Sequence, residues 1–209
     1  VNVESAVLLG LEAALAALAA AAATLPSADA LLRAVDAERR ARSQAEARRE
    51  LAERAVASCR YPPLGDRGFG PALAMSRFGM SGPDYVRFAN ENVLVVVIIE
   101  RKEAIENIES IASVPGIDVL FVGVNDLSFS LGIGVRTTDP LVEQALTKVL
   151  DAGRRHGIPV GYPTGNPDEI NKRIAQGFRF FQASSDTGLM ASGARDLLSK
   201  VNRTAAPRP

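Results

Sequence analysis

The stretch VLVVVIIERKEAIENIESIASVPGIDVLFVGVNDLS, residues 93–128, decides the fold of this chain. It holds two apolar runs, residues 93–99 and residues 117–123, whose apolar positions are contiguous rather than alternating. Runs of this kind are typical of strands that are buried on both faces of a parallel sheet. Between them, residues 103–114 carry apolar side chains at helical spacing, and a Pro-Gly pair follows. We therefore predict a strand, one helix and a second strand.

A carboxylate follows each of the two predicted strands. Glu100 comes directly after the first apolar run, and Asp126 follows the second run. Because side chains just beyond the carboxyl ends of parallel strands converge on one edge of the sheet, these two acids are expected to meet. Hard divalent cations take oxygen ligands, so the pair suggests a metal site. An alternative stays open, in which Glu100 and Asp126 only cap the helices that follow them.

Strand and helix signals continue to alternate along the rest of the chain. A Gly-containing loop is expected over residues 127–140, followed by a helix with Thr138 or Asp139 as its cap. Further elements are a helix over 140–156, a strand over 158–162, a helix from 166 to 177 with Ile170 and Ile174 inward, a strand over 178–183, and a last helix to about 201. Four strand–helix units in succession indicate an α/β fold with a parallel sheet, half of the eight units of a TIM barrel.

The first part of the chain has a different composition. Residues 1–25 are apolar and rich in Ala, which predicts a buried or interface helix in preference to a signal segment. Residues 27–58 predict a second helix with a largely charged surface. We expect the domain boundary here, with a helical segment over residues 1–58 and an α/β domain over residues 59–209.

Composition narrows the classes of function. Lys and Arg number 24, and Asp and Glu also number 24, so the charge balance points to neither a nucleic-acid partner nor a membrane surface. The single Cys excludes an intrachain disulfide and a cysteine zinc cluster, which fits a cytoplasmic protein. His156 is the only histidine, and its place at a predicted helix end suggests a surface position.

A loop rich in Gly and Pro spans residues 60–82, ahead of a short helix over residues 84–92. Long loops in compact domains are often functional. Arg67 lies among glycines, where exposed backbone N–H groups could help it to bind an anion. A local ion pair with Asp66 is the alternative, and the residues alone do not decide between them.

Four stretches of the chain together resemble a known family. They are RYPPLGDRGFG (60–70), VLVVVIIERKEAIENI (93–108), PGIDVLFVGVNDLSFSLG (115–132) and GFRFFQASSDTGLM (177–190). These stretches resemble the HpcH/HpaI aldolase/citrate lyase family, and within it the class II pyruvate aldolases. The resemblance extends over residues 46–203, with a Glu that ends one strand and an Asp-Leu-Ser after the next as its most specific features.

The resemblance implies a TIM-barrel lyase that uses Mg²⁺, Mn²⁺ or Co²⁺ and acts on a 2-oxo acid and an aldehyde. In that family pattern, Glu100 and Asp126 would bind the metal. Gly123, Asn125 and Asp126 would contribute to substrate binding, with backbone N–H groups near Asn125 holding the substrate carboxylate. Arg67 would lie near the mouth of the site as a catalytic residue. Aldol cleavage of 4-hydroxy-2-oxo acids through a pyruvate enolate is the expected reaction.

This sequence departs from the family pattern in several places. The arginine and histidine that the family supplies from its N-terminal strands have no counterpart here. Ile98 stands where the family often has a glutamine, and Val124 stands where it usually has a proline. A half-barrel also leaves a sheet edge and an apolar face uncovered, so we expect a homo-oligomer. A non-catalytic half-barrel that serves as an oligomerisation or interaction module is therefore the alternative to an aldolase.

Overall fold

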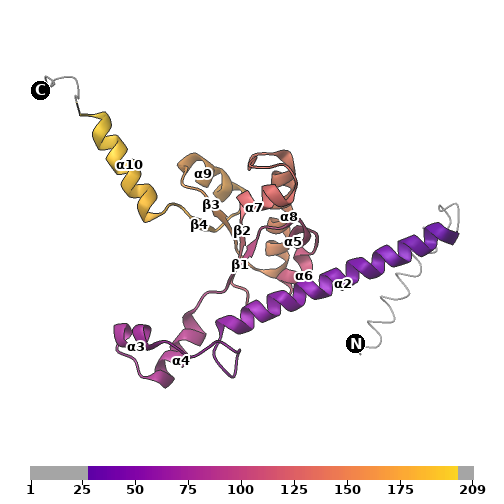
Figure 1. The fold of residues 1–209 in the computed structure, drawn as a ribbon, viewed down its shortest axis with the longest axis horizontal. Helices are drawn as coiled ribbons and strands as arrows, with labels where there is room; N and C mark the ends of the chain where they lie inside the picture. Colours follow the sequence, from indigo (N-terminus) through magenta and orange to yellow (C-terminus); the bar gives the residue numbers. More distant parts are fainter. Residues whose placement is uncertain (1–27, 202–209) are drawn as a thin grey trace, which may run out of the picture. The chain divides into compact units, whose positions relative to one another are not determined.

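The computed structural model describes residues 28–201 of the chain (Figure 1). The helix expected over residues 1–25 lies outside the described residues. The chain divides into two compact units, Val1–Ala47 and Arg48–Pro209, and the division falls within helix α2, Ala28–Cys59. The predicted second helical block is thus confirmed, while the domain boundary expected after residue 58 stays a prediction.

Four parallel strands form one sheet in the second unit, in the order β1-β2-β3-β4. They are β1 Val96–Ile99, β2 Val119–Val122, β3 Val160–Pro163 and β4 Phe180–Gln182. Figure 1 shows the four strands side by side. Along the chain, at least one helix separates each strand from the next. This alternation confirms the predicted α/β architecture of about four strand–helix units.

The helices expected over residues 84–92, 140–156 and 166–177 and the last helix are confirmed near their predicted positions, whereas residues 72–78 form a helix within the stretch that was expected to be a loop. The helices of this unit are α3 Ala72–Phe78, α4 Gly82–Asn92, α5 Lys102–Glu106, α6 Ile108–Ala112, α7 Val124–Ser130, α8 Pro140–His156, α9 Pro167–Gln176 and α10 Asp186–Ser199. Asp139 caps α8 by accepting a hydrogen bond of 3.0 Å from the backbone N–H of Leu141. Gly157 ends α8 in the left-handed conformation, with φ of 69°, which favours glycine.

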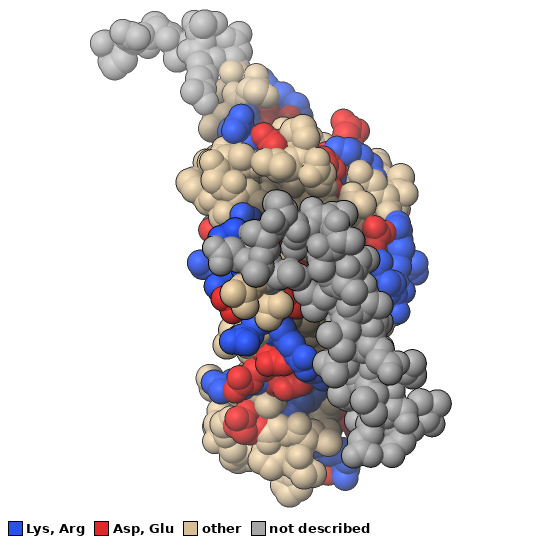
Figure 2. Space-filling model, turned by 90° about the vertical axis from the view of Figure 1, so that its right-hand side faces the viewer, with Lys and Arg blue, Asp and Glu red and all other residues tan. Residues whose placement is uncertain are grey.

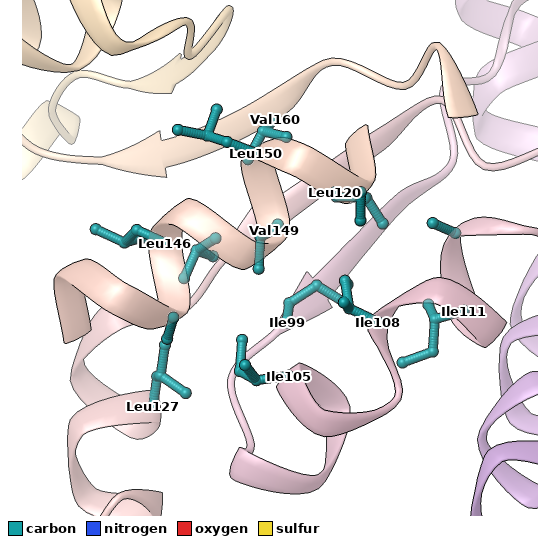
Figure 3. Packing of buried hydrophobic residues seen from close by; sticks show 14 of the residues in the cluster. Ile99, Ile105, Ile108, Ile111, Leu120, Leu127, Leu146, Val149, Leu150 and Val160 are labelled. Carbon is teal, nitrogen blue, oxygen red and sulfur yellow. The ribbon is translucent and has the colours of Figure 1, made fainter. Parts of the chain in front are cut away.

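The main core lies between the sheet and the helices that cover one of its faces. Ile99 and Leu120 point from the strands toward Leu146 and Val149 of α8 (Figure 3). Both are almost fully buried, as is Val122 of the same cluster. Burial of large aliphatic side chains contributes about 1.5–3 kcal/mol each, so this layer accounts for much of the stability of the unit.

A buried arginine of α9 forms an ion pair with α8. The Arg173 side chain is fully buried, with one guanidinium nitrogen 2.7 Å from Glu143 and the other 2.7 Å from Glu169. Its guanidinium carbon lies 4.6 Å from the centre of the Tyr162 ring. Ile174, expected to face inward, is instead 54% exposed. The ion pairs therefore decide which side of α9 is buried.

The single helix expected over residues 103–114 is in fact two short helices. The break falls at Asn107, whose backbone adopts φ of −115° and ψ of 23°. Its side-chain amide donates a 2.7 Å hydrogen bond to the backbone carbonyl of Glu103. Side chains of this kind compete with the helical hydrogen-bond pattern, which explains the interruption.

The prediction that the first strand is buried on both faces is wrong. Every residue of β2 is buried, but in β1 the side chains of Val96 and Ile98 are 38% and 55% exposed. Helices cover the sheet face that carries Ile99, and among residues 28–201 no element buries the opposite face at β1. Farther along that face, the Phe121 and Phe180 rings lie 6.1 Å apart above Gly161.

The loop expected over residues 127–140 begins with a helix instead. Residues 124–130 form α7, although Asn, Asp and Ser are weak helix formers. Val124 and Leu127 are buried in the main core and lie on one side of this helix. Tertiary packing thus outweighs the local preference for a turn.

Candidate functional site

Glu100 and Asp126 reach the same end of the sheet because their strands are paired in register. Ile99 of β1 pairs with Val122 of β2, and the backbone N–H of Gly123 donates a 3.1 Å hydrogen bond to the carbonyl of Ile99. Glu100 is the next residue after β1, and Asp126 lies in the first turn of α7, which starts directly after Gly123. The pairing therefore brings both acids to the carboxyl ends of neighbouring strands.

The two acids line one hollow with a volume of about 260 Å³. The other residues that line it are Arg101, Phe129 and Ser130. The structure thus brings together Glu100 and Asp126, as the sequence led us to expect. No side chain caps α5 or α7, so neither carboxylate takes the capping role that was the alternative reading.

Gly123 provides the space into which the Glu100 side chain fits. A Cβ atom at position 123 would lie 2.8 Å from the Glu100 Cβ and 2.9 Å from its Oε2. Both distances are shorter than van der Waals contact allows. The residue at position 123 therefore acts by being small, which is one physical reason for a glycine between β2 and α7.

Hydrogen bonds hold the two segments that carry the acids together. The backbone N–H of Lys102 donates to Ser130 Oγ at 2.8 Å, which ties the turn after β1 to the end of α7. The buried Ser128 hydroxyl donates to the carbonyl of Asn125 at 2.7 Å. The first of these hydrogen bonds connects the two walls of the hollow, and the second lies within α7.

The negative charge of the hollow is not neutralised by ion pairs within residues 28–201. The nearest basic residues in sequence pair elsewhere, with Arg101 3.7 Å from Glu103 and Lys102 3.7 Å from Glu106. On the molecular face that Figure 2 draws, basic and acidic residues are interleaved and neither sign dominates. Arg101 also lines the hollow, but neither Glu100 nor Asp126 forms an ion pair within residues 28–201, and two carboxylates in this state favour a cation.

The donor set of this hollow fits a hard divalent ion. Residues 28–201 contain no group of three or more His, Cys, Asp or Glu side chains arranged to hold a metal, so Glu100 and Asp126 would act as a pair. Mg²⁺ is commonly bound through one or two carboxylates, with water and substrate oxygens completing its octahedron. The absence of a side chain at Gly123 also leaves space for the Glu100 carboxylate beside α7.

Arg67 lies in a different hollow from the two acids. That hollow, of about 390 Å³, is also lined by Tyr61, Pro71 and Tyr85 and shares no residue with the one at Glu100. The guanidinium carbon of Arg67 lies 4.8 Å from the centre of the Tyr61 ring. Stacking on Tyr61, rather than an ion pair with Asp66, is thus its contact in the described part of the chain, and its catalytic role stays a prediction.

Asn125 and Asp126 occupy the second and third positions of α7. Backbone N–H groups in the first turn of a helix have no carbonyl partner within that helix. These groups are therefore available, although their role in substrate binding stays a prediction. His156 lies at the end of α8, 3.1 Å from Glu109 and away from the hollow of Glu100, as expected for a surface histidine.

Three residues of the hollow were not identified from the sequence: Arg101, Phe129 and Ser130. Arg101 had a visible signal, because it adjoins the predicted ligand Glu100. Phe129 and Ser130 had none, since they lie in the stretch that we expected to be a loop. Only the helical turn of α7 brings them beside Asp126.

A family model supports the assignment that this geometry suggests. The model of the HpcH/HpaI aldolase/citrate lyase family matches residues 46–193. The chain belongs to this family. The matched range includes all four strands and both acids of the hollow. Separately, no helix of residues 28–201 has the length and apolar character to cross a membrane.

Characterised relatives of this family member include two bacterial aldolases. The 2-dehydro-3,6-dideoxy-6-sulfogluconate aldolase of Pseudomonas putida is 34% identical over 76% of this chain and 62% of its own length. The 4-hydroxy-2-oxo-heptane-1,7-dioate aldolase of Klebsiella pneumoniae is 35% identical over 75% of this chain and 59% of its own length. The chain thus spans about 60% of the length of these relatives.

Solved structures of the family share its fold. An HpcH/HpaI family protein from Burkholderia cenocepacia is 34% identical, with a TM-score of 0.64 over 73% of this chain and 60% of that one. Macrophomate synthase is 25% identical, with a TM-score of 0.55 over 73% of this chain and 55% of that one. The four strand–helix units therefore correspond to part of a TIM-barrel aldolase, as the sequence predicted.

Proposed function

We propose that this protein is a divalent-metal-dependent carbon–carbon lyase that cleaves 4-hydroxy-2-oxo acids to pyruvate and an aldehyde, and that joins them in reverse. One observation carries the proposal: Glu100 and Asp126 line a common hollow at the carboxyl ends of two neighbouring parallel strands. The chain spans about 60% of the length of its relatives, so we assign their activity to this chain as a proposal.

In this proposal each residue of the hollow has a distinct task. Glu100 and Asp126 would hold Mg²⁺, Mn²⁺ or Co²⁺, which when bound supplies a Lewis acid for the carbonyl oxygen of the 2-oxo acid. The backbone N–H groups of Asn125 and Asp126 would orient the substrate carboxylate. Gly123 keeps the Glu100 carboxylate beside α7. Arg67 remains the proposed cation for a developing negative charge, although it lines a separate hollow.

Two successive measurements, first of metal binding and then of proton exchange, test the proposal. Mn²⁺ affinity is measured by electron paramagnetic resonance for the full chain, for Glu100→Gln and for Asp126→Asn. Glu106→Gln is the matched control, because this exposed acid pairs with Lys102 and does not line the hollow. The exchange of the pyruvate methyl protons in D₂O is then followed by NMR with and without Mn²⁺.

We expect each hollow variant to lose Mn²⁺ affinity and the control to keep it. Metal-dependent exchange of the pyruvate protons by the unmodified chain would support the lyase. If Glu100→Gln and Asp126→Asn bind Mn²⁺ as tightly as the unmodified chain, the metal site is elsewhere and the proposal fails.

Self-association is the second candidate function, and the exposed sheet face favours it. Leu94, Val96 and Ile98 are 61%, 38% and 55% exposed, although they lie at or within a strand. No residue of α10 is buried, while its Leu189 and Leu197 are 65% and 66% exposed. Apolar surfaces of this kind are typical of interfaces, so we propose that copies of the chain form a homo-oligomer.

A further inference from the structure

Arg101 lines the same hollow as the two proposed metal ligands. It is the residue that precedes α5, and its backbone carbonyl accepts hydrogen bonds from the N–H groups of Ala104 at 2.9 Å and Ile105 at 3.1 Å. The main chain of Arg101 is therefore fixed relative to Glu100. Its positively charged side chain thus lines the hollow together with the two carboxylates.

The guanidinium group of Arg101 is only weakly engaged by the protein. Its Nε atom lies 3.7 Å from a Glu103 carboxylate oxygen, too far for a hydrogen bond, and the side chain is 69% exposed. Within residues 28–201 it has no closer ionic partner, in contrast to Arg173, which has carboxylates at 2.7 Å. The donors of Arg101 are therefore available to a ligand.

The composition of the hollow indicates which ligand would use these donors. Two carboxylates suit a divalent ion, whereas a guanidinium suits a planar anion such as a carboxylate, which it binds through paired N–H groups. The Phe129 ring, 60% exposed, lines the same hollow and offers an apolar contact. A molecule with an anionic group at each end and a short carbon chain between them would satisfy all three features.

We propose that Arg101 forms an anion subsite that selects 2-oxo acids with a second carboxylate at the far end of the molecule. This inference rests on the proposed function, because the 2-oxo acid end would bind beside Glu100 and Asp126. Arg101 is then a specificity-determining residue, which distinguishes substrates by their second charge. A surface ion pair with Glu103 would be its alternative role.

Two ligands of equal chain length separate these roles. Isothermal titration calorimetry with saturating Mn²⁺ measures the affinity of the full chain for 2-oxoglutarate and for 2-oxopentanoate, which lacks the second carboxylate. We expect the unmodified chain to prefer 2-oxoglutarate by about tenfold, as a charge-assisted hydrogen bond allows. Arg101→Gln should remove this preference and leave the affinity for 2-oxopentanoate unchanged.

Two further variants control for charge and geometry. Lys102→Gln removes a neighbouring positive charge that does not line the hollow, and it should keep the preference. Arg101→Lys should retain part of it, because an ammonium binds a carboxylate without the paired geometry. Mn²⁺ itself should bind Arg101→Gln at least as tightly as the unmodified chain, since a nearby positive charge is removed.

The outcomes separate this inference from the proposed function. Equal affinities for the two acids, or a preference that survives in Arg101→Gln, would overturn the subsite while metal and 2-oxopentanoate binding still supported the lyase. A chain that binds no Mn²⁺ through Glu100 and Asp126 would overturn both.

Discussion

The Glu100 side chain lies directly against Gly123, where any side chain would collide with it. A Cβ at position 123 would approach the Glu100 Oε2 to 2.9 Å. We therefore expect Gly123→Ala to displace the carboxylate and to lower Mn²⁺ affinity by about tenfold, a modest loss for one displaced ligand. The measurement is a Mn²⁺ titration followed by electron paramagnetic resonance.

Gly193→Ala is the matched control for this displacement. A Cβ at position 193 meets nothing within 4 Å, and the residue lies in α10, away from the hollow. Its Mn²⁺ affinity should equal that of the unmodified chain. Unchanged affinity in Gly123→Ala would show that the position of Glu100 does not depend on the glycine.

The buried Arg173 should be among the most important side chains for stability. Arg173→Met leaves the carboxylates of Glu143 and Glu169 without their partner, and breaking a buried ion pair in this way costs about 3–5 kcal/mol. Urea unfolding followed by circular dichroism at pH 7 measures the change. Lys172→Met is the control, because Lys172 contacts the same Glu143 at 3.4 Å but is half exposed, and its loss should cost less than about 1 kcal/mol.

The same ion pair should make stability depend on pH. Hydrogen bonds from Arg173 hold the pKa of the Glu143 carboxyl below its usual value of 4.5. A depressed folded-state pKa stabilises the fold above the unfolded-state pKa, and this stabilisation is lost as the pH falls through the folded-state pKa. The difference in unfolding free energy between the unmodified chain and Arg173→Met should therefore shrink below about pH 4.5. A difference that stays constant in acid would contradict this prediction.

Gly161 should tolerate no larger residue, because two aromatic rings lie over it. A Cβ there would lie 2.5 Å from a Phe121 ring carbon and 3.1 Å from a Phe180 ring carbon. We expect Gly161→Ala to lower the unfolding free energy by about 1–3 kcal/mol, the usual range for overpacking. Gly68→Ala, where a Cβ meets nothing within 4 Å, should change it by less than about 0.5 kcal/mol.

The exposed face of β1 predicts the effect of charge on association. Ile98→Lys places a cation on this face, at a position that is 55% exposed, and it should shift the chain toward smaller species in multi-angle light scattering. Lys102→Glu changes a charge outside the sheet and should leave the mass unchanged. A monodisperse monomer of the unmodified chain would count against the proposed homo-oligomer.

Much of the architecture follows from local patterns in the sequence. The contiguous apolar runs before Glu100 and Asp126 correctly predict β1 and β2, because such runs are typical of parallel strands, although only β2 is buried on both faces. Asp139 and Gly157 bound α8 as expected, since caps depend on a few adjacent atoms. What local patterns missed was the break at Asn107, where one side-chain hydrogen bond outweighs the helical periodicity.

The composition of the hollow could be predicted only in part. Glu100 and Asp126 were predicted because both follow strands, and strand order brings their ends together. The position of Arg67 relative to the two acids could not be predicted, because the local sequence of a loop rich in Gly and Pro does not determine its path. Phe129 and Ser130 became wall residues only through α7, a helix that its own residue types do not favour.

The order of strands and helices, the family and the two acids at the strand ends were determined by the sequence itself, because hydrophobic periodicity and residue type are properties of neighbouring positions. Only the tertiary structure decided that Glu100 lies against Gly123, that Arg101 shares their hollow and that Arg173 replaces Ile174 as the buried residue of α9. These are contacts between segments far apart in the chain, and their free energy depends on distances that no local pattern contains.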